Sequence, residues 1–136
     1  MSGIVVRVRV GGETYGLPVA NVREVSDLET IAAVPGSGPA VLGVLNLRGR
    51  VLPAFDLARV LGIQREQNPT RLVIAEHDGR LVGLAVDEVS DVGSLDGALD
   101  EAEPEYLAGS TLQDGELVGL LDVGRTFAAL ERHATG

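Results

Sequence analysis

The two halves of the sequence carry the same pattern of glycines and aliphatic residues. Gly12 and Gly79 stand 67 positions apart, and that offset superposes five further pairs: Gly16 on Gly83, Leu17 on Leu84, Val19 on Val86, Val22 on Val89 and Val25 on Val92. An offset of 66 superposes other pairs: Gly43 on Gly109, Gly49 on Gly115, Val51 on Leu117 and Asp56 on Asp122. Similarity at a fixed offset is the mark of a repeated structural unit. We therefore expect one domain, residues 1–136, with halves at approximately 1–66 and 67–136 between which strands can be exchanged.

Short strands and tight turns are predicted in each half. Ile4 to Val10 alternates apolar residues with arginine, a Gly-Gly turn follows, and Thr14 to Val19 is apolar again, which predicts a hairpin. Arg71 to Val89 repeats this arrangement around the turn His77-Asp78-Gly79. We expect strands at residues 4–10, 14–19, 22–28, 41–48, 51–55, 71–77, 80–86, 89–95, 107–113 and 116–121.

A short helix is predicted after the last strand of each half. Asp56 and Asp122 stand where a carboxylate accepts hydrogen bonds from the first free N–H groups of a helix, and Gly62 suits a left-handed C-cap. In the second helix, apolar residues recur at helical spacing and give a face that docks on the sheets: Val123, Phe127 and Leu130. The predicted fold is mostly β, with two similar five-stranded barrels packed together.

Composition and charge exclude several classes of partner. The net charge is −9, and nucleic-acid affinity depends on neutralising phosphates, so we expect no nucleic-acid partner. No apolar run approaches the roughly 20 residues that cross a bilayer, and the N-terminal residues alternate with arginine instead of forming a signal-peptide core. With no cysteine there is no thiol chemistry. We expect a cytoplasmic protein without membrane insertion.

The sequence offers few candidates for catalysis. His77 and His133 lack the neighbouring pattern of a nucleophile and base, and we expect His77 to be a solvated turn residue. Asp56 and Asp122 form a pair related by the repeat, which leaves an acid-type hydrolase as an alternative. The capping role explains both positions without catalysis. The acids between Val86 and Val92 alternate between faces, so we expect no metal site, no cofactor and no enzymatic activity.

Three segments carry a resemblance to a known family: Val41 to Gly62, Tyr15 to Val25 and Val82 to Val92. The most specific part is the run Gly-x-x-Asn-Leu-Arg-Gly, followed by Pro and Asp-Leu. In these segments the sequence is similar to the CheW family of chemotaxis coupling proteins. The resemblance implies two five-stranded barrels of the SH3 kind, which agrees with the duplication. It also implies a non-enzymatic adaptor that links the signalling tips of methyl-accepting chemoreceptors to the regulatory domain of the histidine kinase CheA.

The resemblance also implies binding residues. It carries over two family motifs onto this sequence, and the matching positions are Val22, Glu24, Gly43, Asn46, Arg48 and Gly49. It places an apolar groove for a receptor helix between the barrels, with Arg48 at its margin. We expect Glu24 and Arg48 to pair across neighbouring strands. Two alternatives stay open within the family: a module of a non-flagellar chemosensory pathway, and a module that associates with itself into rings.

Overall fold

The computed structural model describes residues 3–28, 38–64, 67–95 and 106–134. Within these residues the chain forms ten strands, two α-helices and one short 3-10 helix. Their order is β1 (Gly3–Val10), β2 (Glu13–Pro18), η1 (Val19–Asn21), β3 (Val22–Asp27), β4 (Val41–Leu47), β5 (Arg50–Asp56), α1 (Leu57–Leu61), β6 (Arg71–His77), β7 (Arg80–Val86), β8 (Glu88–Leu95), β9 (Leu107–Gln113), β10 (Glu116–Leu121) and α2 (Val123–His133). The ten predicted strands are confirmed, each boundary to within one residue. No helix of the described residues is long and apolar enough to span a membrane.

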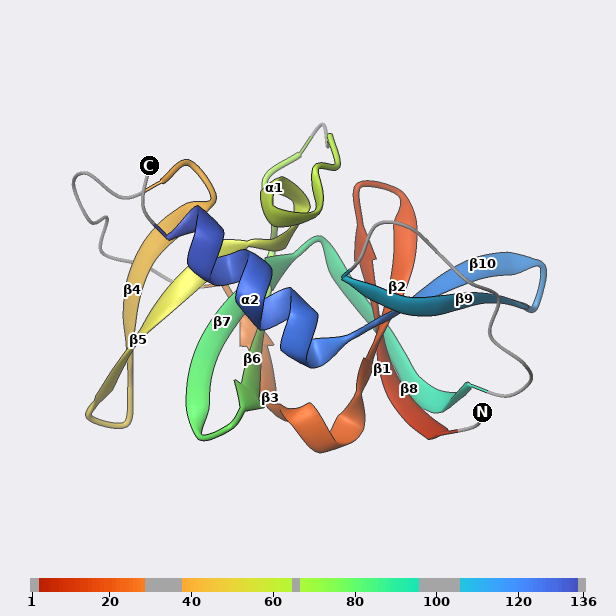
Figure 1. Ribbon diagram of the computed structural model, residues 1–136, viewed down its shortest axis with the longest axis horizontal. Coiled ribbons are helices and arrows are strands. Elements are labelled where there is room, and N and C mark those ends of the chain that lie inside the picture. The colour runs from red at the N-terminus through yellow and green to blue at the C-terminus, as the bar shows by residue number, and fades with distance from the viewer. Residues whose placement is uncertain (1–2, 29–37, 65–66, 96–105, 135–136) are drawn as a thin grey trace.

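The strands form two five-stranded sheets that lie side by side (Figure 1). Sheet A has the order β8-β1-β2-β10-β9, and sheet B has the order β3-β6-β7-β5-β4. The predicted mostly β fold with two five-stranded units is therefore confirmed. The two sheets are not the two halves of the sequence, because each half gives its first hairpin to one sheet and its other three strands to the second sheet.

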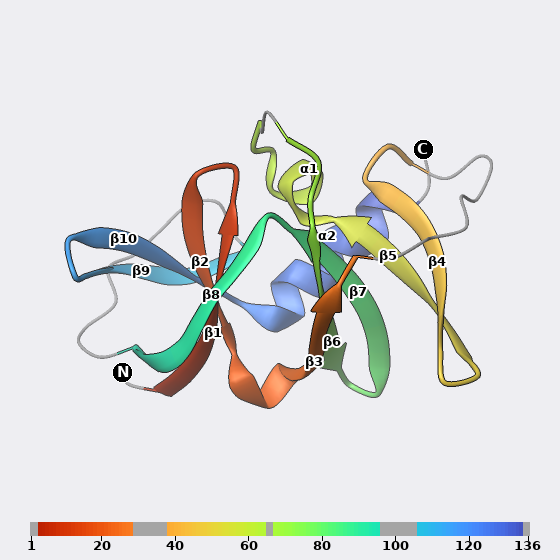
Figure 2. The same cartoon turned by 180° about the vertical axis from the view of Figure 1, so that it is seen from behind.

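Equivalent strands make equivalent pairings in the two sheets. The antiparallel pair β1 and β8 in sheet A corresponds to β6 and β3 in sheet B, and the parallel pair β2 and β10 corresponds to β7 and β5. The repeat extends to single hydrogen bonds: the N–H of Asp56 donates to the carbonyl of Ala40, and that of Asp122 to the carbonyl of Tyr106, both at 2.8 Å. Figure 2 shows β8 of the second half crossing to pair with β1 of the first.

The main hydrophobic core lies between the sheets and joins them. On β1 the alternate residues Val6, Val8 and Val10 are at most 2% exposed, and they share one cluster with Leu84 and Val86 of β7. Smaller clusters lie on the opposite faces of the sheets: Leu52, Leu72, Ile74 and Ala85 in sheet B, and Val5, Leu95 and Val118 in sheet A. Because the central strands bury side chains on both faces, neither sheet has a complete core without the other.

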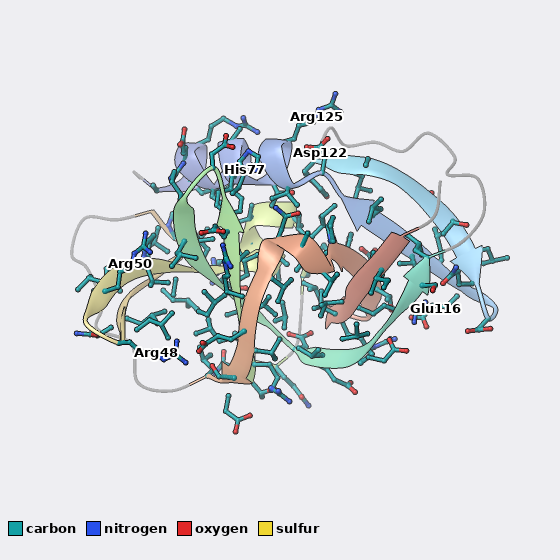
Figure 3. All side chains as sticks on the ribbon, turned by 90° about the horizontal axis from the view of Figure 1, so that it is seen from below. Arg48, Arg50, His77, Glu116, Asp122 and Arg125 are labelled. Atoms are coloured by element: carbon teal, nitrogen blue, oxygen red, sulfur yellow. The ribbon has the colours of Figure 1, made fainter. Side chains whose placement is uncertain are left out.

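Helix α2 docks on the β6–β7 hairpin, as its apolar spacing predicts. Phe127 and Leu130 are 3% and 0% exposed. The ring of His77 lies against Phe127, with the ring centroids 5.4 Å apart, and the Arg80 guanidinium lies 5.9 Å from the centroid of the same ring. Arg80 also forms an ion pair with Glu131. The expectation that His77 is a solvated turn residue is only partly right: His77 is the last residue of β6, and its ring lies against Phe127 while the side chain stays 34% exposed (Figure 3).

The two predicted N-caps differ. Asp122 accepts a hydrogen bond from the backbone N–H of Arg125 at 2.9 Å, which confirms the capping role there. Asp56 stands at the N-cap of α1, but its side chain makes no capping hydrogen bond, so the capping prediction is wrong at this position. The Asp56 carboxylate is 2% exposed and lies instead 3.7 Å from the Nε of Arg59. Gly62 closes α1 in the left-handed region, as predicted, with φ of 74°.

The exchanged strands predict that neither half folds alone. A fragment of residues 1–66 retains two hairpins and β3 but loses β6, β7, β8 and β10, the partners of its strands in both sheets. Isolated two-stranded hairpins are marginally stable at best. We expect each separate half to lack a cooperative thermal transition and to show poor dispersion of amide chemical shifts. Mixing the two halves should restore both signals. A monomeric 1–66 fragment that unfolds cooperatively would contradict the exchange.

Candidate partner-binding site

The turn between β4 and β5 holds Arg48 in an unfavourable backbone conformation. Arg48 and Gly49 form a two-residue hairpin loop with φ angles of 51° and 83°, the pattern of a type I′ turn. Asp78 and Asp114 occupy the corresponding first position in two other hairpins. Aspartate, asparagine and glycine are the usual residues there, because a longer side chain fits the left-handed region poorly. An arginine at this position therefore calls for an explanation in its side chain.

Three other predicted residues shape this hairpin. The Oδ1 of Asn46 accepts a hydrogen bond from the backbone N–H of Gly49 at 2.8 Å, which stabilises the turn. Gly49 itself supplies the positive φ. Gly43 is buried at a register shift between β4 and β5, with φ of 148°, where a side chain would be strained. Asn46 and Gly49 therefore hold the turn at Arg48, whereas Gly43 lies further back on β4, opposite Ala54.

The predicted ion pair between Arg48 and Glu24 is present. The Nη1 of Arg48 lies 2.9 Å from the Oε2 of Glu24, and the two side chains are 76% and 29% exposed. The prediction that the pair joins neighbouring strands is wrong. Glu24 is on β3 and Arg48 follows β4, and these two strands stand at opposite ends of the strand order in sheet B. The pair therefore spans the gap between the first and last strands of the sheet. An exposed pair of this kind adds about 0 to 1 kcal/mol of stability, so its main effect is to orient the guanidinium.

The surroundings of this pair are apolar. Leu45 and Leu47 of β4 are half-buried and pack on the cluster of sheet B that contains Leu52. Figure 3 shows Arg48 at the tip of the β4–β5 hairpin, at the end of the molecule opposite Glu116 on the β9–β10 hairpin. The structure thus places Arg48 on sheet B, away from the junction between the sheets that the resemblance implied.

Val22 lies apart from the Glu24–Arg48 pair. A register shift between Val22 and Glu24 turns the two side chains to different faces of sheet B. Val22 packs against the core between the sheets, whereas Glu24 is opposite Ile74, whose side chain lies in the cluster on the other face. The six predicted residues are therefore divided between the junction of the sheets and the Arg48 hairpin.

A surface that the sequence did not reveal lies beside Val22. Ile4, Val19 and Val92 are 55%, 40% and 59% exposed. Ile4 continues the face of β1 that is buried at Val6, and Val92 is opposite Val6 on β8. Val19 follows the end of β2 that pairs with this end of β1. We call these residues the Ile4–Val19–Val92 patch. Alternation along β1 places Ile4 on the same face as the buried Val6, and Ile4 is exposed because it lies near the beginning of the strand.

The aspartates of the hydrolase alternative are held separately. Asp56 ends β5 of sheet B beside Arg59, and the carboxylate of Asp122 caps α2 after β10 of sheet A. Each carboxylate faces groups of its own helix, whereas a proton-sharing pair needs two carboxyl groups in contact. Across residues 3–28, 38–64, 67–95 and 106–134, no group of three or more histidine, aspartate and glutamate residues lies together as a metal site requires.

Comparison with known proteins identifies the family. The model of the CheW-like domain matches residues 5–131. The chain belongs to the CheW-like domain family. It is 30% identical to the probable chemotaxis protein CheW of Rhizobium etli, over 93% of this chain and 88% of that protein, and 30% identical to chemotaxis protein CheW of Bacillus subtilis, over 83% and 79%. The crystal structure of the scaffolding protein TtCheW of Thermoanaerobacter tengcongensis superposes with a TM-score of 0.80 at 27% identity, covering 90% of each chain.

One relative of this CheW-like chain has a different name. Protein PilI of Pseudomonas aeruginosa is 37% identical over 83 residues, which cover 60% of this chain and 47% of that protein. The match to TtCheW supports the predicted SH3-like architecture, because it spans nearly the whole of both chains. The resemblance stated from the sequence motifs is therefore confirmed at the level of family and fold.

We expect Arg48→Asn to leave stability unchanged to within about 1 kcal/mol. The substitution loses an exposed ion pair worth at most about 1 kcal/mol. It relieves a left-handed arginine by a similar amount, because asparagine is favoured in this turn. Urea unfolding measures the difference, and Gly49→Ala is the control that should lower stability by about 1 kcal/mol or more. A loss above about 2 kcal/mol for Arg48→Asn would show that the arginine is needed for folding.

Proposed function

We propose that this CheW-like chain is a non-enzymatic adaptor, which couples the signalling tip of a methyl-accepting chemoreceptor to the regulatory domain of the histidine kinase CheA. The observation that carries the proposal is the exposed Arg48, kept in a turn that disfavours it and oriented by Glu24. The family match over residues 5–131 and the similarity to a scaffolding protein support the same role. The adaptor is cytoplasmic and is recruited to receptor arrays at the membrane.

An adaptor needs two surfaces that bind different partners at once. The Arg48 hairpin offers a charged group beside half-buried leucines, at the outer end of sheet B. The Ile4–Val19–Val92 patch offers exposed aliphatic side chains at the junction of the sheets. Partner-binding surfaces typically combine an apolar centre, which supplies most of the free energy, with charged groups that select the partner and fix its orientation. The two surfaces are formed by different elements, the β4–β5 hairpin of sheet B and the strands β1 and β8 of sheet A with η1, so each can contact a different partner.

The chemistry of the Arg48 hairpin suits a receptor helix. An amphipathic helix presents an apolar stripe with charges along its margin. Leu45 and Leu47 would contact the stripe, and the guanidinium would pair with a carboxylate at the margin. Because Glu24 already orients Arg48, the side chain loses less conformational entropy when it binds. The Ile4–Val19–Val92 patch would then contact the kinase domain.

A second candidate is the same adaptor role in a non-flagellar pathway. It is favoured by the similarity to PilI of Pseudomonas aeruginosa, which is not named as a chemotaxis protein. The surfaces described above are the same for either pathway. Self-association into rings is a third arrangement, and the Ile4–Val19–Val92 patch is the surface that would serve it.

Binding to both partners tests the proposal. The full chain should capture the isolated regulatory domain of CheA and, in a separate experiment, a receptor signalling tip. Arg48→Glu and Glu24→Arg should each weaken receptor binding at least about tenfold, because the first sets like charges against each other at the margin and the second removes the group that orients Arg48. The double charge swap should rebuild the internal ion pair without restoring the affinity, because position 48 then presents a carboxylate to the carboxylate of the receptor helix.

Arg23→Glu is the matched control, because Arg23 lies next to Glu24 on β3 and forms an exposed ion pair with Glu76 of β6. This variant should bind the receptor tip normally. Val92→Ser should weaken kinase binding and leave receptor binding intact. Failure of the unchanged chain to bind either partner, or normal receptor binding by Arg48→Glu, would contradict the proposal.

A further inference from the structure

A groove of about 770 Å³ lies on the side of sheet A that faces α1. Its apolar lining comes from the end of α1 and from β2, β9 and β10: Tyr15, Leu61, Ile63, Tyr106, Leu107 and Leu117. We call it the α1 groove. In Figure 1 it corresponds to the region between α1 and the strands β2, β9 and β10. It is distinct from the Arg48 hairpin and from the Ile4–Val19–Val92 patch.

The repeat shows what covers the equivalent surface on sheet B. There, α2 runs for eleven residues and buries Phe127 and Leu130 against the β6–β7 hairpin. The repeat equivalent of α2 is α1, which has five residues, contacts β5 and β7 of sheet B and ends at Gly62, so that only its last residues reach the groove on sheet A. Leu61 is the repeat equivalent of Phe127, so α1 stops where α2 continues for two more turns. The α1 groove is therefore the surface that the second part of a longer helix would cover.

The groove continues into an exposed apolar pair. Leu112 and Leu117 are opposite each other on β9 and β10 and are 69% and 63% exposed. The equivalent pair on sheet B is Asn46 and Val51, one polar and one apolar residue. Two exposed leucines side by side add apolar area in contact with water, which burial against a partner would remove.

The charge at the groove is opposite to that on sheet B. On sheet B, Arg80 forms an ion pair with Glu131 of α2; the repeat equivalent of Arg80 in the groove on sheet A is Glu13. In the same way, the repeat equivalent of Arg50 on sheet B is Glu116 in the groove. Glu13 accepts a hydrogen bond from the hydroxyl of Tyr15, and burial raises the pKa of that phenol, so the hydroxyl stays a donor. Glu116 is already paired with Arg9 at 2.7 Å, so Glu13 is the carboxylate that a helix in the groove would meet where α2 meets the Arg80 guanidinium.

We propose that the α1 groove binds one amphipathic helix of a partner protein, with apolar residues spaced as Phe127 and Leu130 are in α2 and with arginine or lysine at the position of Glu131. A second copy of this chain is a poor occupant, since its net charge is −9 and the apolar face of its own α2 is buried. This proposal does not depend on the partners named under the proposed function.

Two peptides test the proposal on the full-length chain. Both copy residues 122–134 with blocked ends; one keeps Glu131 and the other carries Glu131→Arg. Amide chemical shifts of the chain should respond to the arginine peptide at Tyr15, Tyr106 and Leu117. The arginine peptide should bind about fivefold more tightly than the glutamate peptide, because one exposed charge contact is worth up to about 1 kcal/mol. In a Glu13→Arg chain this preference should reverse.

Leu117→Ser should weaken binding of the arginine peptide at least about fivefold, through the loss of buried apolar area. Val51→Ser is the matched control, because Val51 is 66% exposed at the equivalent position of sheet B, and it should bind normally. Thermal melting shows whether each variant is folded. Equal affinity for the two peptides, shifts around Phe127 that indicate displacement of α2, or no saturable shifts would overturn the proposal. Self-association through Leu112 and Leu117 without peptide would overturn it in favour of a second copy.

Discussion

The exchange of hairpins between the two halves is the constraint on which the rest of the structure depends. Each sheet needs strands from both halves, and the core between the sheets is filled by β1 and β7, the hairpin strands that have changed sides. The exchange makes the chain one cooperative unit, although its sequence is duplicated. It also fixes β3 and β4 at the two ends of sheet B, where Glu24 and Arg48 meet. If each half formed its own sheet, β6 and β7 would not lie between β3 and β5, and the spacing between Glu24 and Arg48 would differ.

Arg48 illustrates how function shows itself against local preference. The sequence forms several hairpins with the same two-residue loop, and Asp78 and Asp114 satisfy the local preference at the first position. Arg48 does not, and its guanidinium is held by Glu24 instead of lying on the sheet. Places where a local rule is broken without gain in stability are expected at functional sites. The geometry of the turn is thus independent support for the site that the family motif implied.

The repeat and the alternation predicted every strand, because turn chemistry and apolar period point to the same boundaries. The exchange between halves was left open, since hairpins of either half offer the same hydrogen-bonding edges. Ile4 and Val92 were missed as a surface because periodicity reports the face of a strand and not how far the neighbouring sheet extends along it. The environment of the Asp56 side chain was missed for a related reason. The residues around Asp56 in the sequence predict the start of a helix, whereas the burial of its carboxylate beside Arg59 depends on how α1 packs in the fold.

Divergence of the two halves explains why the β4–β5 turn carries an arginine that pairs with β3, whereas the equivalent β9–β10 turn carries Asp114. Asp91 is the repeat equivalent of Glu24, and both are acids opposite β1 or β6 in equivalent pairs. In sheet A the strand residue facing Asp91 is Arg7, whose guanidinium bonds to the carboxylate at 2.9 Å and also reaches the carbonyl of Ser94 at 2.8 Å.

In sheet B the residue facing Glu24 is Ile74, which is 1% exposed and cannot pair with a carboxylate. Glu24 is therefore available to a cation from elsewhere, and the β4–β5 turn supplies it at Arg48, whose side chain is 76% exposed. The Arg7 side chain, in contrast, is 17% exposed. The two equivalent carboxylates thus have different partners: Asp91 pairs with an arginine on the neighbouring strand of sheet A, and Glu24 orients an exposed arginine of the β4–β5 turn in sheet B.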